Sequence, residues 1–147
     1  ACLREINRML TQEGSVPAIA YARSKFISQP SLALAYRLAQ LYASEAKDHE
    51  AVEVLKIIRF MTRFSSDDFV LVQKIANFLH KLDEGEMALN IYKNLLEERE
   101  LDKQLKISLY QGGARIAAAQ NEPVIASRWD LEARKLKSPP TPKPTNG

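Results

Sequence analysis

Apolar residues recur along residues 1–137 at intervals of three and four positions, which is the spacing of one face of an α-helix. The alternation of apolar and polar residues that is typical of a half-buried strand is absent from this part of the chain. Polar joints interrupt the helical pattern about every ten to sixteen residues. The pattern predicts an all-α protein of about eight helices, and the short joints make consecutive helices antiparallel neighbours.

Several joints carry signals for the start of a helix. Pro17 and Pro123 suit a first helical turn, where the backbone N–H groups have no partner within the helix. The Ser-Ser-Asp stretch at 65–67 precedes one apolar run, and Asp83 precedes the next. Side chains of these types accept hydrogen bonds from orphan N–H groups, so we expect N-caps at both places.

Alanine occupies positions where a larger apolar residue would bury more surface. Three pairs share a separation of twelve positions: Ala39 with Ala51, Ala76 with Ala88, and Ala114 with Ala126. The second member of each pair continues a series that begins at Ala18, with intervals of 33, 37 and 38 positions. Such a period is typical of helical repeats. Because two facing Cβ atoms let antiparallel helices approach closely, we expect the alanines at helix crossing points, with larger neighbours interlocked around them.

The pattern resembles that of the tetratricopeptide-repeat (TPR) superfamily. Its motif has small residues at the eighth and twentieth positions and larger apolar residues at the seventh, eleventh and twenty-fourth. With Ala51 and then Ala88 at the twentieth position, the remaining signature positions hold Leu38, Ala39, Tyr42 and Leu55, and then Ile75, Ala76, Leu79 and Tyr92. The match departs from the motif where Ile6 replaces a small residue and where two repeat intervals are longer than usual.

The resemblance implies a right-handed superhelix of about four antiparallel helix pairs, a TPR-like α-solenoid. The pairs would span roughly residues 1–30, 31–65, 66–100 and 101–137 of a single repeat domain. Residues 138–147 follow as a separate tail with four prolines, which exclude a helix and favour an extended, disordered end.

The net charge of +3 is a property of the C-terminal end. Residues 134–147 contain four basic residues and no acid, so the rest of the chain sums to −1. A repeat domain without an excess of positive charge is a poor match for the phosphate backbone of a nucleic acid. No apolar run approaches the length of a membrane-spanning helix, and no signal peptide is visible.

Candidate chemistry is sparse. His49 and His80 have no second His or Cys at the spacing of metal ligands, and Cys2 is a single thiol. The pair Gly112-Gly113 lacks a phosphate-loop pattern and fits close helix packing, and the acids at 84–86 fit a solvated helix face. The single tryptophan, Trp129, is expected to pack on the last helix, with a role as a binding anchor as the alternative. We therefore expect no enzyme activity, no metal and no cofactor.

The TPR resemblance implies that the first helix of each pair lines a concave binding face. The residues assigned to that face are rich in amides and bases, with one tyrosine as a stacking surface. Such a lining suits an extended peptide, because amides pair with its backbone and bases with a carboxylate. The alternative is an ordinary solvated face. The candidates are Tyr36, Arg37, Gln40, Gln73, Lys74, Asn77, Gln111 and Arg115.

These observations favour a non-catalytic scaffold or adaptor that binds a peptide or a partner subunit. By analogy with where bacterial TPR-like proteins work, we expect a place in a secretion, pilus or polysaccharide assembly apparatus. A dedicated chaperone or regulator for one client protein is the alternative, and a helical-repeat nucleic-acid binder is less favoured. The apolar side of the first helix, with Leu3 and Ile6, predicts self-association through the repeat ends or a preceding part of a longer repeat protein.

Overall fold

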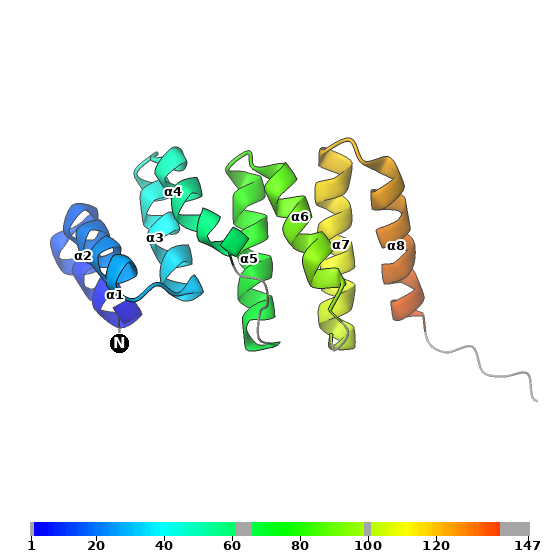
Figure 1. Cartoon of the computed structure of the whole chain (residues 1–147), viewed down its shortest axis with the longest axis horizontal. Helices are drawn as coiled ribbons and strands as arrows, with labels where there is room; N and C mark the ends of the chain where they lie inside the picture. The colour runs from blue at the N-terminus through cyan, green and yellow to red at the C-terminus, as the bar shows by residue number, and fades with distance from the viewer. Residues whose placement is uncertain (1, 61–65, 99–100, 139–147) are drawn as a thin grey trace, which may run out of the picture. The chain divides into compact units, whose positions relative to one another are not determined.

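The computed structural model describes residues 2–60, 66–98 and 101–138, which contain eight α-helices, two short 3-10 helices and no strand. The prediction of an all-α protein is confirmed (Figure 1). The predicted Pro-rich tail beyond Ser138 lies outside the described residues and stays a prediction. The elements are α1 (Cys2–Glu13), α2 (Ser15–Ser28), α3 (Leu32–Ser44), α4 (Asp48–Leu55), η1 (Lys56–Phe60), η2 (Ser66–Asp68), α5 (Phe69–Lys81), α6 (Gly85–Leu96), α7 (Lys103–Ala119) and α8 (Pro123–Lys137).

Two helices differ in length from the predicted range. The α-helical part of α4 has eight residues, because the chain tightens into the 3-10 turn η1 directly after Leu55. Helix α7 is longer, with seventeen residues. A switch from α-helix to 3-10 helix changes the hydrogen-bond spacing and leaves the apolar pattern almost intact, so the pattern did not reveal it.

The chain divides into two compact units, residues 1–75 and 76–147, with the boundary inside α5. In the first unit α1 packs against α2, α2 against α3, and α3 against α4. In the second unit α6 packs against α7, and α7 against α8. Packing between elements that are adjacent along the chain is the arrangement of helical repeats.

The repeated alanines all lie in the protein interior. Ala39, Ala51, Ala76 and Ala88 have no exposed surface, and Ala126 is the most exposed of the series at 9%. The larger residues expected around them are also buried: Leu38, Tyr42, Leu55, Ile75, Leu79 and Tyr92. Close-packed interiors leave no room for an added side chain at such positions, which is what a crossing point requires.

The turn inside three of the helix pairs has the same backbone conformation. Ala46, Asp83 and Asn121 have φ angles of 58°, 66° and 59°, in the left-handed region. In each turn the following N–H donates a hydrogen bond of 2.9 Å to a carbonyl five positions back, from Lys47 to Tyr42, from Glu84 to Leu79 and from Glu122 to Ala117. This bond is the Schellman ending of a helix. The three turns are 37 and 38 positions apart, so the backbone repeats with the same period as the alanines.

The predicted cap at Asp83 is wrong. Asp83 occupies the left-handed position after α5, and the N-cap of α6 is Glu84, whose side chain makes no cap hydrogen bond. Aspartate favours both places, because its short polar side chain tolerates positive φ as well as capping a helix. By contrast, Pro123 begins α8 as predicted.

The other predicted cap falls on residues 65–67. Ser66 and Asp67 belong to the 3-10 turn η2, which leads into α5, and Ser65 lies outside the described residues. Two further helices have N-caps that were not among the predicted ones. The side chains of Ser31 and Asp102 accept hydrogen bonds from the N–H groups of Leu34 and Leu105, at the starts of α3 and α7.

We expect Ala46→Gly to raise the free energy of unfolding by about 0.5–1 kcal/mol. Alanine is strained at positive φ because its Cβ approaches the backbone, and glycine has no such contact. Urea denaturation followed by circular dichroism measures the change. Ala43→Gly, three positions earlier within α3, is the matched control and is expected to lower stability by about 1 kcal/mol. A loss of stability in both variants would contradict the left-handed turn.

The two adjacent glycines of α7 mark a close approach in the second unit. A Cβ added at Gly113 would lie 2.6 Å from Cζ3 of Trp129 and 3.2 Å from Cδ1 of Tyr92. One added at Gly112 would lie 2.5 Å from the Tyr92 hydroxyl oxygen. The distances of 2.5 Å and 2.6 Å are too short for non-bonded atoms, so the aromatic rings of α6 and α8 use the space that the glycines leave. The glycine pair therefore has the packing role that its sequence indicated, and Trp129 lies buried against it.

Candidate functional site

The eight candidate residues lie on first helices of the pairs and are distributed over both units. Each is at least partly exposed, and none belongs to the buried core. That they form one continuous concave face stays a prediction. The first unit holds Tyr36, Arg37 and Gln40 on α3 with Gln73 and Lys74 on α5, and the second unit holds Asn77 on α5 with Gln111 and Arg115 on α7.

Arg37 is bound to the first helix of the chain. Its Nη2 donates a hydrogen bond of 2.7 Å to Oδ1 of Asn7 on α1. Its Nε is buried and has no hydrogen-bond partner among the residues that the structure describes. The guanidinium thus joins α3 to α1, and replacing it would alter the packing of the first unit as well as any contact with a ligand. Arg37 is for this reason a poor choice for a test of binding.

Asn77 has a side-chain amide whose orientation is fixed by a hydrogen bond from a buried residue. The hydroxyl of Tyr92 on α6 donates a hydrogen bond of 2.6 Å to Oδ1 of Asn77. Tyr92 is fully buried, whereas Asn77 is exposed. Because the oxygen faces the tyrosine, the Nδ2 group is the part of the amide that remains to donate outward. An oriented amide donor suits a carbonyl or carboxylate acceptor on a ligand.

Two candidates are exposed cations. Lys74 on α5 belongs to the first unit and Arg115 on α7 to the second. Neither forms an ion pair with another residue that the structure describes. Their charges are therefore available to a carboxylate on a partner, at the modest strength of exposed ion pairs.

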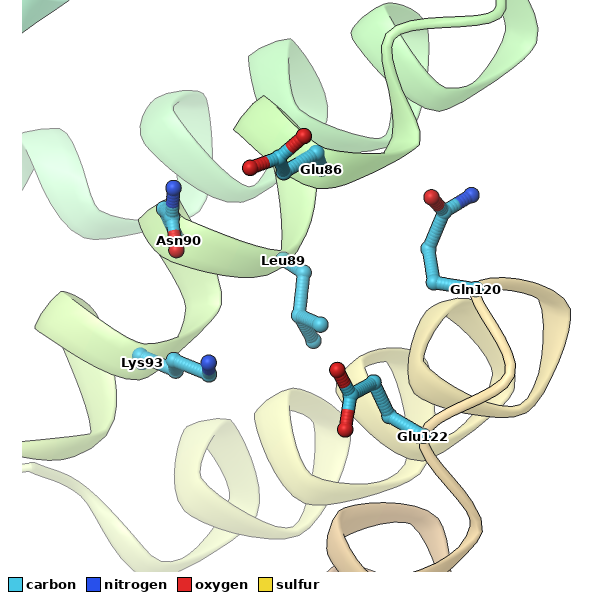
Figure 2. Close-up of a pocket in the computed structure, with 6 residues that line it drawn as sticks. All are labelled: Glu86, Leu89, Asn90, Lys93, Gln120 and Glu122. Atoms are coloured by element: carbon cyan, nitrogen blue, oxygen red, sulfur yellow. The ribbon is translucent and has the colours of Figure 1, made fainter.

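A pocket of about 250 Å³ opens beside α6 in the second unit (Figure 2). One wall is a single face of α6, with residues at the helical intervals of three, four and seven positions. The opposite wall is the turn between α7 and α8. The lining residues are Glu86, Leu89, Asn90 and Lys93 of α6, with Gln120 and Glu122 of the turn.

None of the pocket residues was predicted as a site. The TPR resemblance assigns the binding face to first helices, whereas α6 is a second helix and the opposite wall of the pocket is a turn. The acids at 84–86 fit a solvated helix face, and Glu86 is exposed. Nothing in the local pattern around residue 86 indicates that residues 120–122 lie opposite it.

Tyr110 on α7 is a titratable group with a perturbed environment. Burial raises the pKa of its phenol above the ordinary value, and the nearby carboxylate of Glu132 adds to that increase. Its ring centroid is 6.5 Å from that of Trp129, with an angle of 59° between the planes. A neutral phenol tilted against an indole is a packing arrangement between α7 and α8.

Over residues 2–60, 66–98 and 101–138, no three His, Cys, Asp or Glu side chains gather closely enough to hold a metal ion. No helix in the same ranges combines the length and apolar character that crossing a membrane requires.

Comparison with known proteins identifies the fold. No family model matches the chain, and no curated protein sequence matches it. Eight chains of solved structures are similar, among them MamA MSR-1 C2, a TPR-containing protein. The two are 15% identical with a TM-score of 0.59, and the similarity covers 92% of this chain and 74% of the MamA chain. The chain therefore has a TPR-like helical-repeat fold.

Proposed function

We propose that this chain is a non-catalytic scaffold or adaptor that binds a protein partner through its TPR-like helix pairs. The observation that carries the proposal is the exposed amide of Asn77, which the buried Tyr92 hydroxyl holds in one orientation. A donor fixed in this way loses little freedom when it meets an acceptor, so it favours binding. The TPR-like fold supports the proposal, because helical repeats present extended surfaces to their partners.

The partner segment that we propose is an extended peptide with acidic side chains. The amide of Asn77 would donate to the peptide backbone, and the exposed cations Lys74 and Arg115 would pair with carboxylates. Gln40, Gln73 and Gln111 would supply further amide contacts. A polar lining of this kind recognises the backbone of the peptide and the sign of its charge.

Charge reversal tests this proposal. We expect the double variant Lys74→Glu, Arg115→Glu to remain folded and to bind an acidic partner about tenfold more weakly, from two exposed charge contacts. The measurement is affinity capture from cell extract with the full chain, read by mass spectrometry and followed by titration of the captured protein.

The matched control reverses two exposed bases of α8 that form no ion pair with a described residue, Arg134→Glu with Lys137→Glu. It changes the net charge by the same amount and leaves the first helices unaltered. Loss of the partner only from the first variant supports binding at the first helices. Equal retention by both variants would move the binding site elsewhere, for example to a repeat end that self-associates.

We also propose that the partner belongs to a bacterial secretion, pilus or polysaccharide assembly apparatus, by analogy with the work of similar folds. The same capture experiment addresses it through the identity of the retained protein. Retention of one unstable client would favour the dedicated-chaperone alternative instead.

A further inference from the structure

We propose that the pocket beside α6 binds an arginine side chain of a partner protein. The pocket is lined by two carboxylates, two amides, one ammonium group and one apolar side chain. Its formal charge is −1, which complements a cation. This site lies on a second helix and a turn, so it is separate from the first-helix residues of the proposed function and does not depend on them.

The chemistry of the lining matches a guanidinium group. Glu86 and Glu122 approach the pocket from α6 and from the turn, respectively (Figure 2). Neither forms an ion pair with another described residue, so both carboxylates are available. Guanidinium has five donors in one plane, and the lining offers the two carboxylates together with the amide oxygens of Asn90 and Gln120, which lie on opposite sides of the pocket (Figure 2).

A small apolar surface lies among the polar groups of the lining. Leu89 lies between the polar residues on the α6 face, and the 5% of its surface that is exposed faces no other apolar lining residue. The methylene stem of an arginine would contact this small area while its charged head meets the acids. A bare inorganic cation would gain nothing from this contact.

The wall formed by the turn is held in place by the fold. The side chain of Gln120 lies against Gly85, where an added Cβ would be 2.5 Å from Cδ of the glutamine. Between Gln120 and Glu122, Asn121 adopts the left-handed conformation, and the N–H of Glu122 is bonded to Ala117. The backbone of the turn is thus positioned before any ligand arrives, which reduces the entropic cost of binding, while the Gln120 side chain is free to adjust to the ligand.

Substitution of Lys93 tests whether the ligand of the pocket is a cation or an anion. It is the single base of the lining and forms no ion pair with a described residue. For a cationic ligand, Lys93→Gln removes repulsion and strengthens binding, while Glu86→Gln and Glu122→Gln remove attraction and weaken it. An anionic ligand would reverse all three signs.

The test is a nuclear magnetic resonance titration of the full, isotope-labelled chain with N-acetyl-arginine amide. We expect saturable shifts at the side-chain amide of Gln120 and along residues 86–93, with a millimolar dissociation constant. Each Glu→Gln change is expected to raise that constant about two- to fivefold, and Lys93→Gln to lower it about twofold. All three side chains are exposed, so the variants are expected to fold.

N-acetyl-citrulline amide is the control ligand, because it has nearly the same shape as the arginine probe and no charge. Equal shifts with both ligands, an absence of saturable shifts at the pocket, or reversed signs in the three variants would overturn the proposal. The Lys74→Glu, Arg115→Glu variant is expected to bind the arginine probe normally. Failure of the pocket and failure of first-helix binding are therefore separate results.

Discussion

Ala88→Leu is expected to lower the free energy of unfolding by about 1–3 kcal/mol, and Ala51→Leu by a similar amount. Both alanines have no exposed surface, and each lies among buried larger residues, Tyr92 in the α6 segment and Leu55 in the α4 segment. A leucine there has no empty space to occupy, so neighbouring side chains must leave their preferred rotamers or the helices must move apart.

The measurement is urea denaturation of each variant, followed by far-ultraviolet circular dichroism. Ala118→Leu is the matched control, because Ala118 is an exposed alanine within α7. Its effect is expected to stay within about 0.5 kcal/mol of zero, as for most surface changes. If the buried and exposed substitutions gave the same stability, the alanines would not be crossing points.

Gly113→Ala is expected to lower the free energy of unfolding by about 1–2 kcal/mol. Alanine improves intrinsic helix propensity by about 1 kcal/mol, which favours the variant. The new methyl group, however, would lie 2.6 Å and 2.7 Å from two ring atoms of Trp129, in the core between α7 and α8. A buried aromatic ring cannot move aside as the end of a flexible side chain can. The cost of overpacking therefore outweighs the gain in helix propensity.

Gly85→Ala is the matched control for that prediction. Its added methyl group would also meet a neighbour, but the neighbour is the end of the flexible Gln120 side chain. We expect Gln120 to turn aside and the stability to stay unchanged or rise by up to about 1 kcal/mol. Equal losses from the two glycine substitutions would show that backbone conformation, not the facing side chain, sets the cost.

The features that the sequence predicted well are periodic and local. The helices follow from apolar spacing, and the buried alanines follow from their recurrence in register with larger residues. Proline at the start of α8 acts within one helical turn, so its effect is visible in the few residues around it. Each of these inferences needs only the position of a residue within its own helix.

The features that the sequence did not predict depend on contacts between distant positions or on backbone conformation. Arg37 meets Asn7 across 30 positions, and the pocket joins Glu86 to a turn near residue 120. The left-handed turn at Ala46 has no side-chain signal, because alanine is ordinarily a helix former. The orientation of the Asn77 amide follows from a hydroxyl on another helix.

The packing of Trp129 makes the last helix pair a reporter of its own unfolding. As the single tryptophan of the chain, buried against Gly113 and beside Tyr110, it senses by fluorescence only the surroundings of α7 and α8. Circular dichroism averages over every helix. Because packing joins mainly adjacent helices, the two signals need not change at the same denaturant concentration. The gap between their midpoints would measure the cooperativity that links the C-terminal pair to the rest of the array.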